Sequence, residues 1–108
     1  MIDQRQHTLG KFIPYAFETL TIDNTVGGIG LTASTTYLLS SPRPKRAFLT
    51  FDDAQCRVTK DSTAPTTTIG HLYNPTQSLL LEGFSQLNNF RAIRTGTTSA
   101  TLQVTYLR

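Results

Sequence analysis

The chain has 108 residues, a formal net charge of +3 and only 16% charged residues. This size fits one domain, and the small charged fraction is typical of a folded chain and not of a disordered one. No apolar run reaches the roughly 18 residues needed to span a bilayer, and the polar N-terminus lacks the apolar core of a secretory signal. The single cysteine, Cys56, excludes an internal disulfide and a cysteine cluster for zinc. We therefore expect no membrane contact, and folding in a reducing cytoplasm.

Threonine dominates the composition with 19 residues, while serine adds 7 and tryptophan is absent. Branching at Cβ restricts the χ1 angle of threonine in a helix and suits the pleated surface of a sheet. The 10 basic residues exceed the 7 acidic ones only mildly, which does not by itself indicate a nucleic-acid ligand. The composition therefore predicts a β-rich fold.

Residues 1–15 differ from the rest of the chain, because they are polar, contain Gly10 and Pro14, and show neither a strand period nor a helix period. We interpret them as an extended N-terminal arm. Its large apolar side chains are Leu9, Phe12, Ile13 and Tyr15. Since a solvated tail has no need of such side chains, we predict that they contact a partner chain. The alternative is a frayed terminus, as many chain ends are.

From residue 16 onward, short apolar or threonine-rich segments alternate with turns built from Gly, Pro, Asn, Asp and Ser. We expect strands at residues 17–22, 35–39, 45–51, 55–60, 66–72, 78–82, 90–95 and 100–107. Residues 83–89 are predicted to form an irregular loop or one helical turn. The last two strands are predicted to pair across residues 96–99.

The final segment has the clearest pattern of the chain. Ala100, Leu102, Val104 and Tyr106 alternate with polar residues, which is the period of a half-buried strand. About eight short strands at intervals of roughly 8–12 residues are typical of an antiparallel sandwich. We therefore predict an all-β fold, an antiparallel β-sandwich of jelly-roll-like character, formed by a single domain at residues 16–108 and preceded by the arm.

The sequence contains no clear catalytic or ligand-binding set. His7 and His71 are far apart in the chain. His71 is predicted to donate to backbone at a strand end, although Asp53 or Asp61 could in principle pair with it. Asp52 and Asp53 are adjacent, so on a strand they point to opposite faces and cannot readily share a proton. We therefore expect no enzyme activity, no metal and no cofactor.

Two groups of cations are candidate partner contacts. Arg43, Lys45 and Arg46 cluster around two prolines and form a short basic patch. They either touch nucleic acid or an acidic protein surface, or they lie in a solvated loop and blunt the edge of a sheet. Arg91 and Arg94 stand on opposite faces of one predicted strand. We expect at least one of the two to be buried with a carboxylate or to lie in a subunit contact, unless both are ordinary surface arginines.

Nucleic-acid binding is not expected. Proteins that bind single-stranded nucleic acid on a sheet combine cations with rows of aromatic side chains on which bases stack. Phe48 and Phe51 are predicted to fall on opposite faces of one strand, so the sequence does not predict such a row.

The second half of the chain contains a distinctive order of short motifs. A turn with the pattern D-x-T-x-P-T-x-x-x-G-H begins at Asp61 and is followed by a leucine-rich strand at residues 79–83. A loop, the segment N-F-R-A-I-R at residues 89–94 and a closing strand at residues 100–106 complete the order. These motifs resemble small virion proteins of tailed bacteriophages. The resemblance covers residues 55–107 and implies a virion setting for the chain.

We therefore expect a structural virion protein that is made in the cytoplasm of a host bacterium. The leading hypothesis is a capsid decoration (cement) protein, which stabilises the head by bridging capsid subunits. Its expected partners are the major capsid protein or other virion proteins, and we expect a homo-oligomer, with a trimer favoured. The alternatives are a structural component of the neck, the tail or the head-fibre base, and, from a different class, a carbohydrate-binding module for adsorption.

Overall fold

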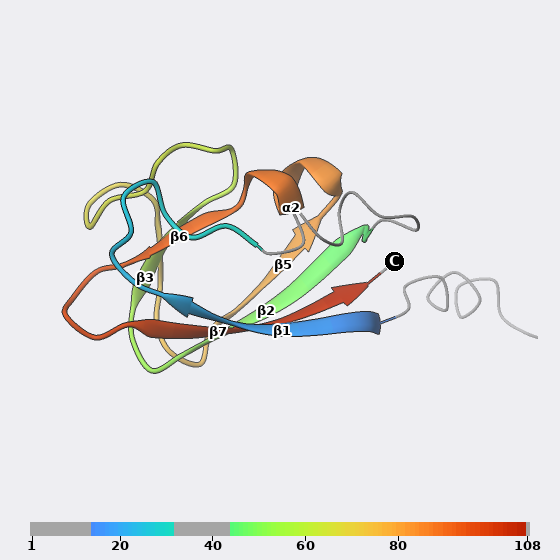
Figure 1. Cartoon of the computed structure of the whole chain (residues 1–108), viewed down its shortest axis with the longest axis horizontal. Coiled ribbons are helices and arrows are strands. Elements are labelled where there is room, and N and C mark those ends of the chain that lie inside the picture. Colours follow the sequence, from blue (N-terminus) through green and yellow to red (C-terminus); the bar gives the residue numbers. More distant parts are fainter. Residues whose placement is uncertain (1–13, 32–43, 108) are drawn as a thin grey trace, which may run out of the picture.

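The computed structural model describes residues 14–31 and 44–107. Within these residues it has seven strands and one short helix, drawn in Figure 1. In chain order they are β1 (Pro14–Ile22), β2 (Arg46–Asp52), β3 (Cys56–Thr59), β4 (His71–Tyr73), β5 (Ser78–Glu82), α2 (Phe84–Asn89), β6 (Arg91–Arg94) and β7 (Ala100–Leu107). Residues 1–13 of the predicted arm and the predicted strand at residues 35–39 lie outside the described residues.

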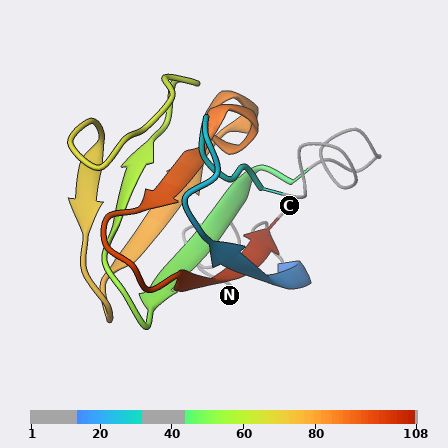
Figure 2. The same cartoon turned by 60° about the vertical axis from the view of Figure 1, so that its left-hand side comes forward.

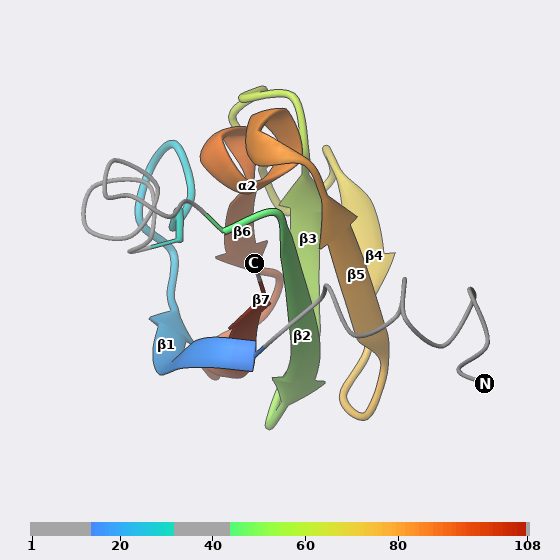
Figure 3. The same ribbon diagram turned by 90° about the vertical axis from the view of Figure 1, so that its right-hand side faces the viewer.

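The strands form two sheets in which every pairing is antiparallel. The larger sheet has the strand order β1-β7-β2-β5, and the smaller sheet has the order β4-β3-β6. Figure 2 shows β1, in blue, at the margin of the larger sheet, and Figure 3 shows α2 at one end of the strands. The predicted all-β, antiparallel, sandwich-like fold is therefore confirmed.

Alternation along the strands builds the core between the two sheets. In β7 every second residue from Ala100 to Tyr106 is buried, and the residues between them are half-buried. The buried residues of β2 and β5 follow the same period. Phe51 of β2 stacks on Tyr73 of β4, with the ring centroids 4.7 Å apart, and so joins the two sheets. The period-two pattern predicted for the last strand is confirmed.

The segment predicted as a loop or one helical turn forms the short helix α2. Gly83 precedes it with a φ of +90°, a backbone conformation that favours glycine. Leu87 is its buried side chain and anchors the helix to the core. Among residues 14–31 and 44–107, no helix is long and apolar enough to cross a membrane.

The prediction that the last two strands pair with each other is wrong. β6 pairs with β3 in the smaller sheet, whereas β7 lies between β1 and β2 in the larger one. Residues 95–99 therefore lead from one sheet to the other. Thr95 at the end of β6 is held by Gln55, whose backbone and side-chain oxygens accept hydrogen bonds from the Thr95 backbone N–H and hydroxyl at 3.3 and 2.9 Å. These contacts hold the end of β6 in its own layer.

Most of the strand predicted at residues 66–72 is a turn, and the strand β4 has three residues only. The Thr66 hydroxyl accepts hydrogen bonds from the backbone N–H groups of Thr68 and Ile69, at 3.2 and 3.0 Å. A threonine side chain that bonds to nearby backbone in this way competes with a sheet ladder. Gly70 follows with a φ of +122°, which a side chain would disfavour.

The first strand begins earlier than predicted. β1 includes Pro14 and Tyr15, which the sequence pattern placed in the arm, and it pairs with β7 from Pro14↔Leu107 to Ile22↔Ala100. The register shifts between Pro14 and Ala16. Proline is tolerated there because it starts a strand at the edge of a sheet, where its missing N–H is not needed.

Replacing a core side chain of β7 should cost far more stability than replacing an outward one. Leu102 is fully buried, so L102A should lower the free energy of unfolding by about 2–4 kcal/mol, because it leaves a cavity. The matched control is T105A on the other face of the same strand, which should cost less than about 1 kcal/mol. Urea denaturation followed by circular dichroism measures both. Equal losses would contradict the alternation of β7.

The Cys56 thiol should react only after unfolding. The side chain is fully buried, and burial raises its pKa to about 12, so the reactive thiolate is scarce at neutral pH. In a thiol-reagent assay at pH 8, we expect slow labelling of the native protein and fast labelling in denaturant. Labelling at equal rates under both conditions would show that Cys56 is accessible.

Candidate protein-binding surface

One face of the larger sheet points away from the core. The strand register places Phe17 of β1 beside Thr105 of β7, Thr105 beside Phe48 of β2, and Phe48 beside Leu80 of β5. Directly opposed residues share a face, so these four side chains form one line across the strands, which we call the apolar row. Phe17, Phe48 and Leu80 are 59%, 45% and 42% exposed. Three large apolar side chains thus face outward together.

A second line of side chains runs beside the apolar row. Its members are Thr19, Gln103, Thr50 and Ser78, which are opposed in the same way. We call them the polar row. The Thr19 hydroxyl of β1 donates to the Gln103 side-chain oxygen of β7 at 2.8 Å, so these two side chains hold each other in place. The apolar and polar rows together are called the outer face.

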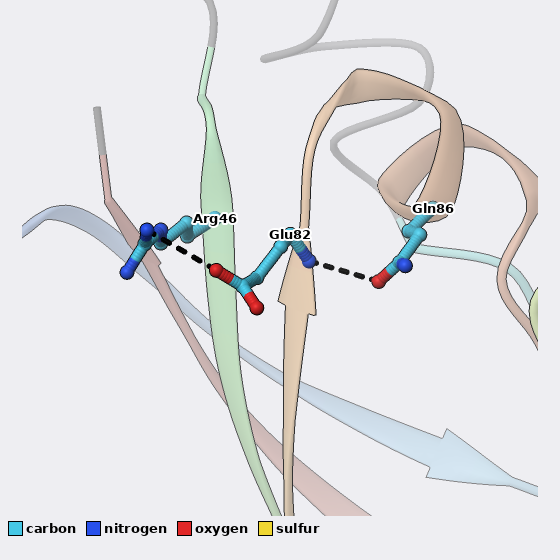
Figure 4. Close-up of polar contacts among 3 residues, drawn as sticks. All are labelled: Arg46, Glu82 and Gln86. Atoms are coloured by element: carbon cyan, nitrogen blue, oxygen red, sulfur yellow. Dashed lines mark hydrogen bonds and ion pairs between the residues drawn. The ribbon is translucent and has the colours of Figure 1, made fainter.

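The outer face has no charged residue in either row. Charges flank it at its two ends instead. At one end Arg46 pairs with Glu82 across β2 and β5 at 3.1 Å, and the Glu82 backbone N–H donates to Gln86 of α2 at 2.9 Å (Figure 4). At the other end Thr101 donates to the Asp53 carboxylate at 2.5 Å. The same face of the sheet carries Arg46 and Glu82 in the row beyond one end and Asp52 in the row beyond the other, so the outer face is an uncharged strip between charged rows.

The outward face of the smaller sheet is different, because residues 60–70 fold over it. Arg57 of β3 donates to the backbone oxygens of Thr67 and Gly70, at 3.3 and 3.0 Å. Pro65 is buried and lies so close to Gly28 that a Cβ there would sit 2.9 Å from the proline ring. This face is therefore covered by its own chain. Within residues 14–31 and 44–107, no segment covers the apolar row, since its large side chains stay exposed.

The cations singled out from the sequence are in different situations. Arg43 lies outside the described residues. Lys45 is exposed, and its backbone is held on both sides, donating to Leu107 at 2.8 Å and accepting from Gly83 at 2.7 Å. Arg46 is half-buried in its pair with Glu82. Lys45 and Arg46 thus lie together at the basic end of the outer face.

Arg91 and Arg94 are both half-buried and both bonded within their own chain. Arg91 donates to the backbone oxygens of Phe90 and Asn88, at 2.7 and 3.3 Å, and so stabilises the end of α2. Arg94 donates to the Ser99 hydroxyl at 3.2 Å. Its Nε is buried without a hydrogen-bond partner in the part of the chain that the structure describes. A contact of either arginine with a partner chain stays a prediction.

The apolar arm residues were predicted to contact a partner chain. Leu9, Phe12 and Ile13 lie outside the described residues, and Tyr15 is a backbone member of β1. Their predicted docking onto a neighbouring chain therefore remains a prediction.

His71 and Asp61 both line a hollow of about 320 Å³. The sequence had left open a pairing of His71 with Asp53 or with Asp61. The other lining residues are Thr59, Lys60, Thr63, Gly70 and Gln86. Asp61 is engaged there in a turn, because its carboxylate accepts from the Thr63 backbone N–H at 3.1 Å. Hydrogen bonds from the Thr63 hydroxyl and backbone lower the pKa of Asp61. No group of three or more potential metal ligands exists among the described residues.

The sequence interpretation did not single out Phe17 and Leu80. A usable signal was nevertheless present, because three consecutive leucines, Leu79 to Leu81, cannot all face the same side of a strand. The structure turns Leu79 and Leu81 inward and Leu80 outward. Which outward residues meet across strands requires the register, and the sequence does not supply it.

No protein-family model matches the chain, and no curated protein or solved structure does either. Its surface geometry is therefore the basis for assigning a function.

The turn carboxylates should make the fold sensitive to acid. Asp23 accepts from the Thr25 hydroxyl and N–H, which lower its pKa, as the bonds from Thr63 lower that of Asp61. A folded-state pKa below the unfolded value contributes stability above roughly pH 4, and this contribution is lost as the pH falls through the folded pKa. We expect the free energy of unfolding to decline below roughly pH 4, and to decline less in D61N. An identical acid profile for D61N would contradict the assignment.

Proposed function

We propose that the chain is a structural protein of a tailed-phage virion, and specifically a capsid decoration protein that stabilises the head by bridging capsid subunits. The observation that carries the proposal is the outer face, an uncharged sheet surface with three large apolar side chains exposed. A row of exposed apolar side chains without charges is a candidate for contact with another molecule. A protein partner fits this surface best, because sheet side chains at regular spacing offer area and shape and no reactive group.

The energetics of the outer face favour a repeated partner. Covering Phe17, Phe48 and Leu80 removes roughly 250 Å² of apolar surface from water, worth about 6 kcal/mol before any costs. Association costs at least about 4 kcal/mol in lost translational and rotational freedom, so one face binds weakly. An oligomer that engages several identical sites on a regular shell gains by avidity. Weak single contacts, multiplied by a lattice, suit a cement role.

The motif that resembles tailed-phage virion proteins supports the virion setting through the fold. Its characteristic residues have structural tasks: Pro65 is buried, Gly70 has a φ of +122°, and Phe90 is fully buried. The resemblance therefore concerns residues that stabilise the fold. The outer face supplies the independent argument for adhesion.

Counting copies in purified virions tests the location. A decoration protein should be present in hundreds of copies per particle by quantitative mass spectrometry, because it follows the capsid lattice. A handful of copies, or a few rings, would contradict the decoration role and favour the neck, tail or head-fibre base.

A binding experiment tests the surface. Purified wild-type protein should cosediment with expanded heads that lack it, and the triple variant F17T/F48T/L80T should bind at least tenfold more weakly. Threonine keeps the β propensity of these positions, so the fold should persist. The matched control is V26T/I69T, which removes two exposed apolar side chains outside the outer face and should bind normally. Loss of binding in the control, or none in the triple variant, would contradict the proposal.

A further inference from the structure

Within the described part of the chain, the margins of the sheets are β1 and β5 in the larger sheet and β4 and β6 in the smaller one. β4 has three residues and β5 has five, and short strands offer little edge for another strand to pair with. β6 is bordered by the chain that follows β1, since the Arg94 backbone N–H donates to the Asp23 backbone oxygen at 3.0 Å and Ile29 bridges to Ala92. β1 is different, because it has nine residues and pairs on one side only, with β7 (Figure 2). Among the described strands, β1 therefore offers the longest edge for a further strand.

Three features of β1 oppose such an addition. Pro14 has no backbone N–H to offer, and the register shifts between Pro14 and Ala16. The third feature is a charge on the inward face, at Glu18. Ala16 and Leu20, two residues before and after it, pack against the core, so Glu18 points to the same side. Natural edge strands use proline, bulges and inward charges to avoid pairing with other chains.

Tyr106 of β7 holds the Glu18 carboxylate on the inward face. Tyr106 is fully buried, and its hydroxyl donates a hydrogen bond to the carboxylate. A buried hydroxyl needs a partner, but a neutral amide oxygen accepts such a bond as well as a carboxylate does. The hydrogen bond alone therefore does not require a charge at residue 18.

We propose that Glu18 guards the β1 edge: its charge prevents the larger sheet from adding a further strand, above all β1 of a second copy. This inference goes beyond the virion role and does not rest on it, because it concerns the edge of the sheet and not the outer face.

Antiparallel pairing of two copies of β1 about a two-fold axis brings the two carboxylates together. The register that uses the whole strand, Pro14–Ile22, is centred on Glu18, so each carboxylate lies directly opposite the other. If only the regular part at residues 16–22 pairs, Glu18 lies opposite Leu20 of the second copy and diagonal to its Glu18. Opposite residues have Cβ atoms about 4.5–5.5 Å apart, and diagonal residues are about 7–8 Å apart. In both registers two like charges approach each other while the new strand displaces their water, which opposes pairing.

Sedimentation velocity of the purified full chain tests the inference, at protein concentrations from about 5 µM to about 1 mM. E18Q keeps an acceptor for the Tyr106 hydroxyl but removes the charge, so it should self-associate at least about tenfold more tightly than the wild type. Circular dichroism verifies that this variant is folded. Hydrogen exchange locates the contact, because the backbone amides of β1 in E18Q should become more protected as the protein concentration rises.

Three control variants should associate no more than the wild type does. E18K places the opposite charge at the same position, and two lysines also repel. D52N removes one negative charge from β2, so it matches the net charge of E18Q. Y106F removes the hydroxyl and its hydrogen bond but leaves the Glu18 charge in place.

The inference is overturned if folded E18Q associates no more tightly than the wild type, or if any of the three controls associates as E18Q does. Added protection that lies outside β1 would overturn it as well. The proposed function fails or stands separately, because the head-binding experiment changes the outer face and leaves residue 18 as it is.

Discussion

The alternation of β7 is the constraint on which the rest of the structure depends. This strand lies between β1 and β2, its inward residues are fully buried, and its outward residues link the rows of the neighbouring strands. A slip of one residue in its register would move the apolar set from the core to the surface. The same alternation therefore determines which side chains the protein buries and which it exposes.

The fold was predictable where a local pattern decides the outcome. The strands β2, β3, β5 and β7 lie within a residue or two of their predicted positions, because period-two burial and turn residues define them in the sequence. The failures arise where contacts distant in sequence decide. The run around Thr66 has strand composition, yet its hydroxyl bonds to nearby backbone. β6 lies in a different sheet from β7 because it pairs with β3, from Cys56↔Arg94 to Thr59↔Arg91, and these partners are far apart in the sequence.

The candidate surface was less predictable than the fold. Sequence reasoning selected cations, because an unpaired charge suggests a partner, but Arg91 and Arg94 bond to groups of their own chain. It did not select Phe17 or Leu80, because an apolar residue on a strand is assigned to the core by default. Only the register reveals that these two side chains and Phe48 lie on one line.

The pairing of β1 with β7 has a consequence for biosynthesis. Pro14 pairs with Leu107, so the larger sheet joins residues that are far apart in the sequence. Such non-local pairing slows folding. The sheet cannot close until β7 has been translated and has emerged from the ribosome. Until then the emerging polypeptide exposes unpaired strands, which are prone to aggregate.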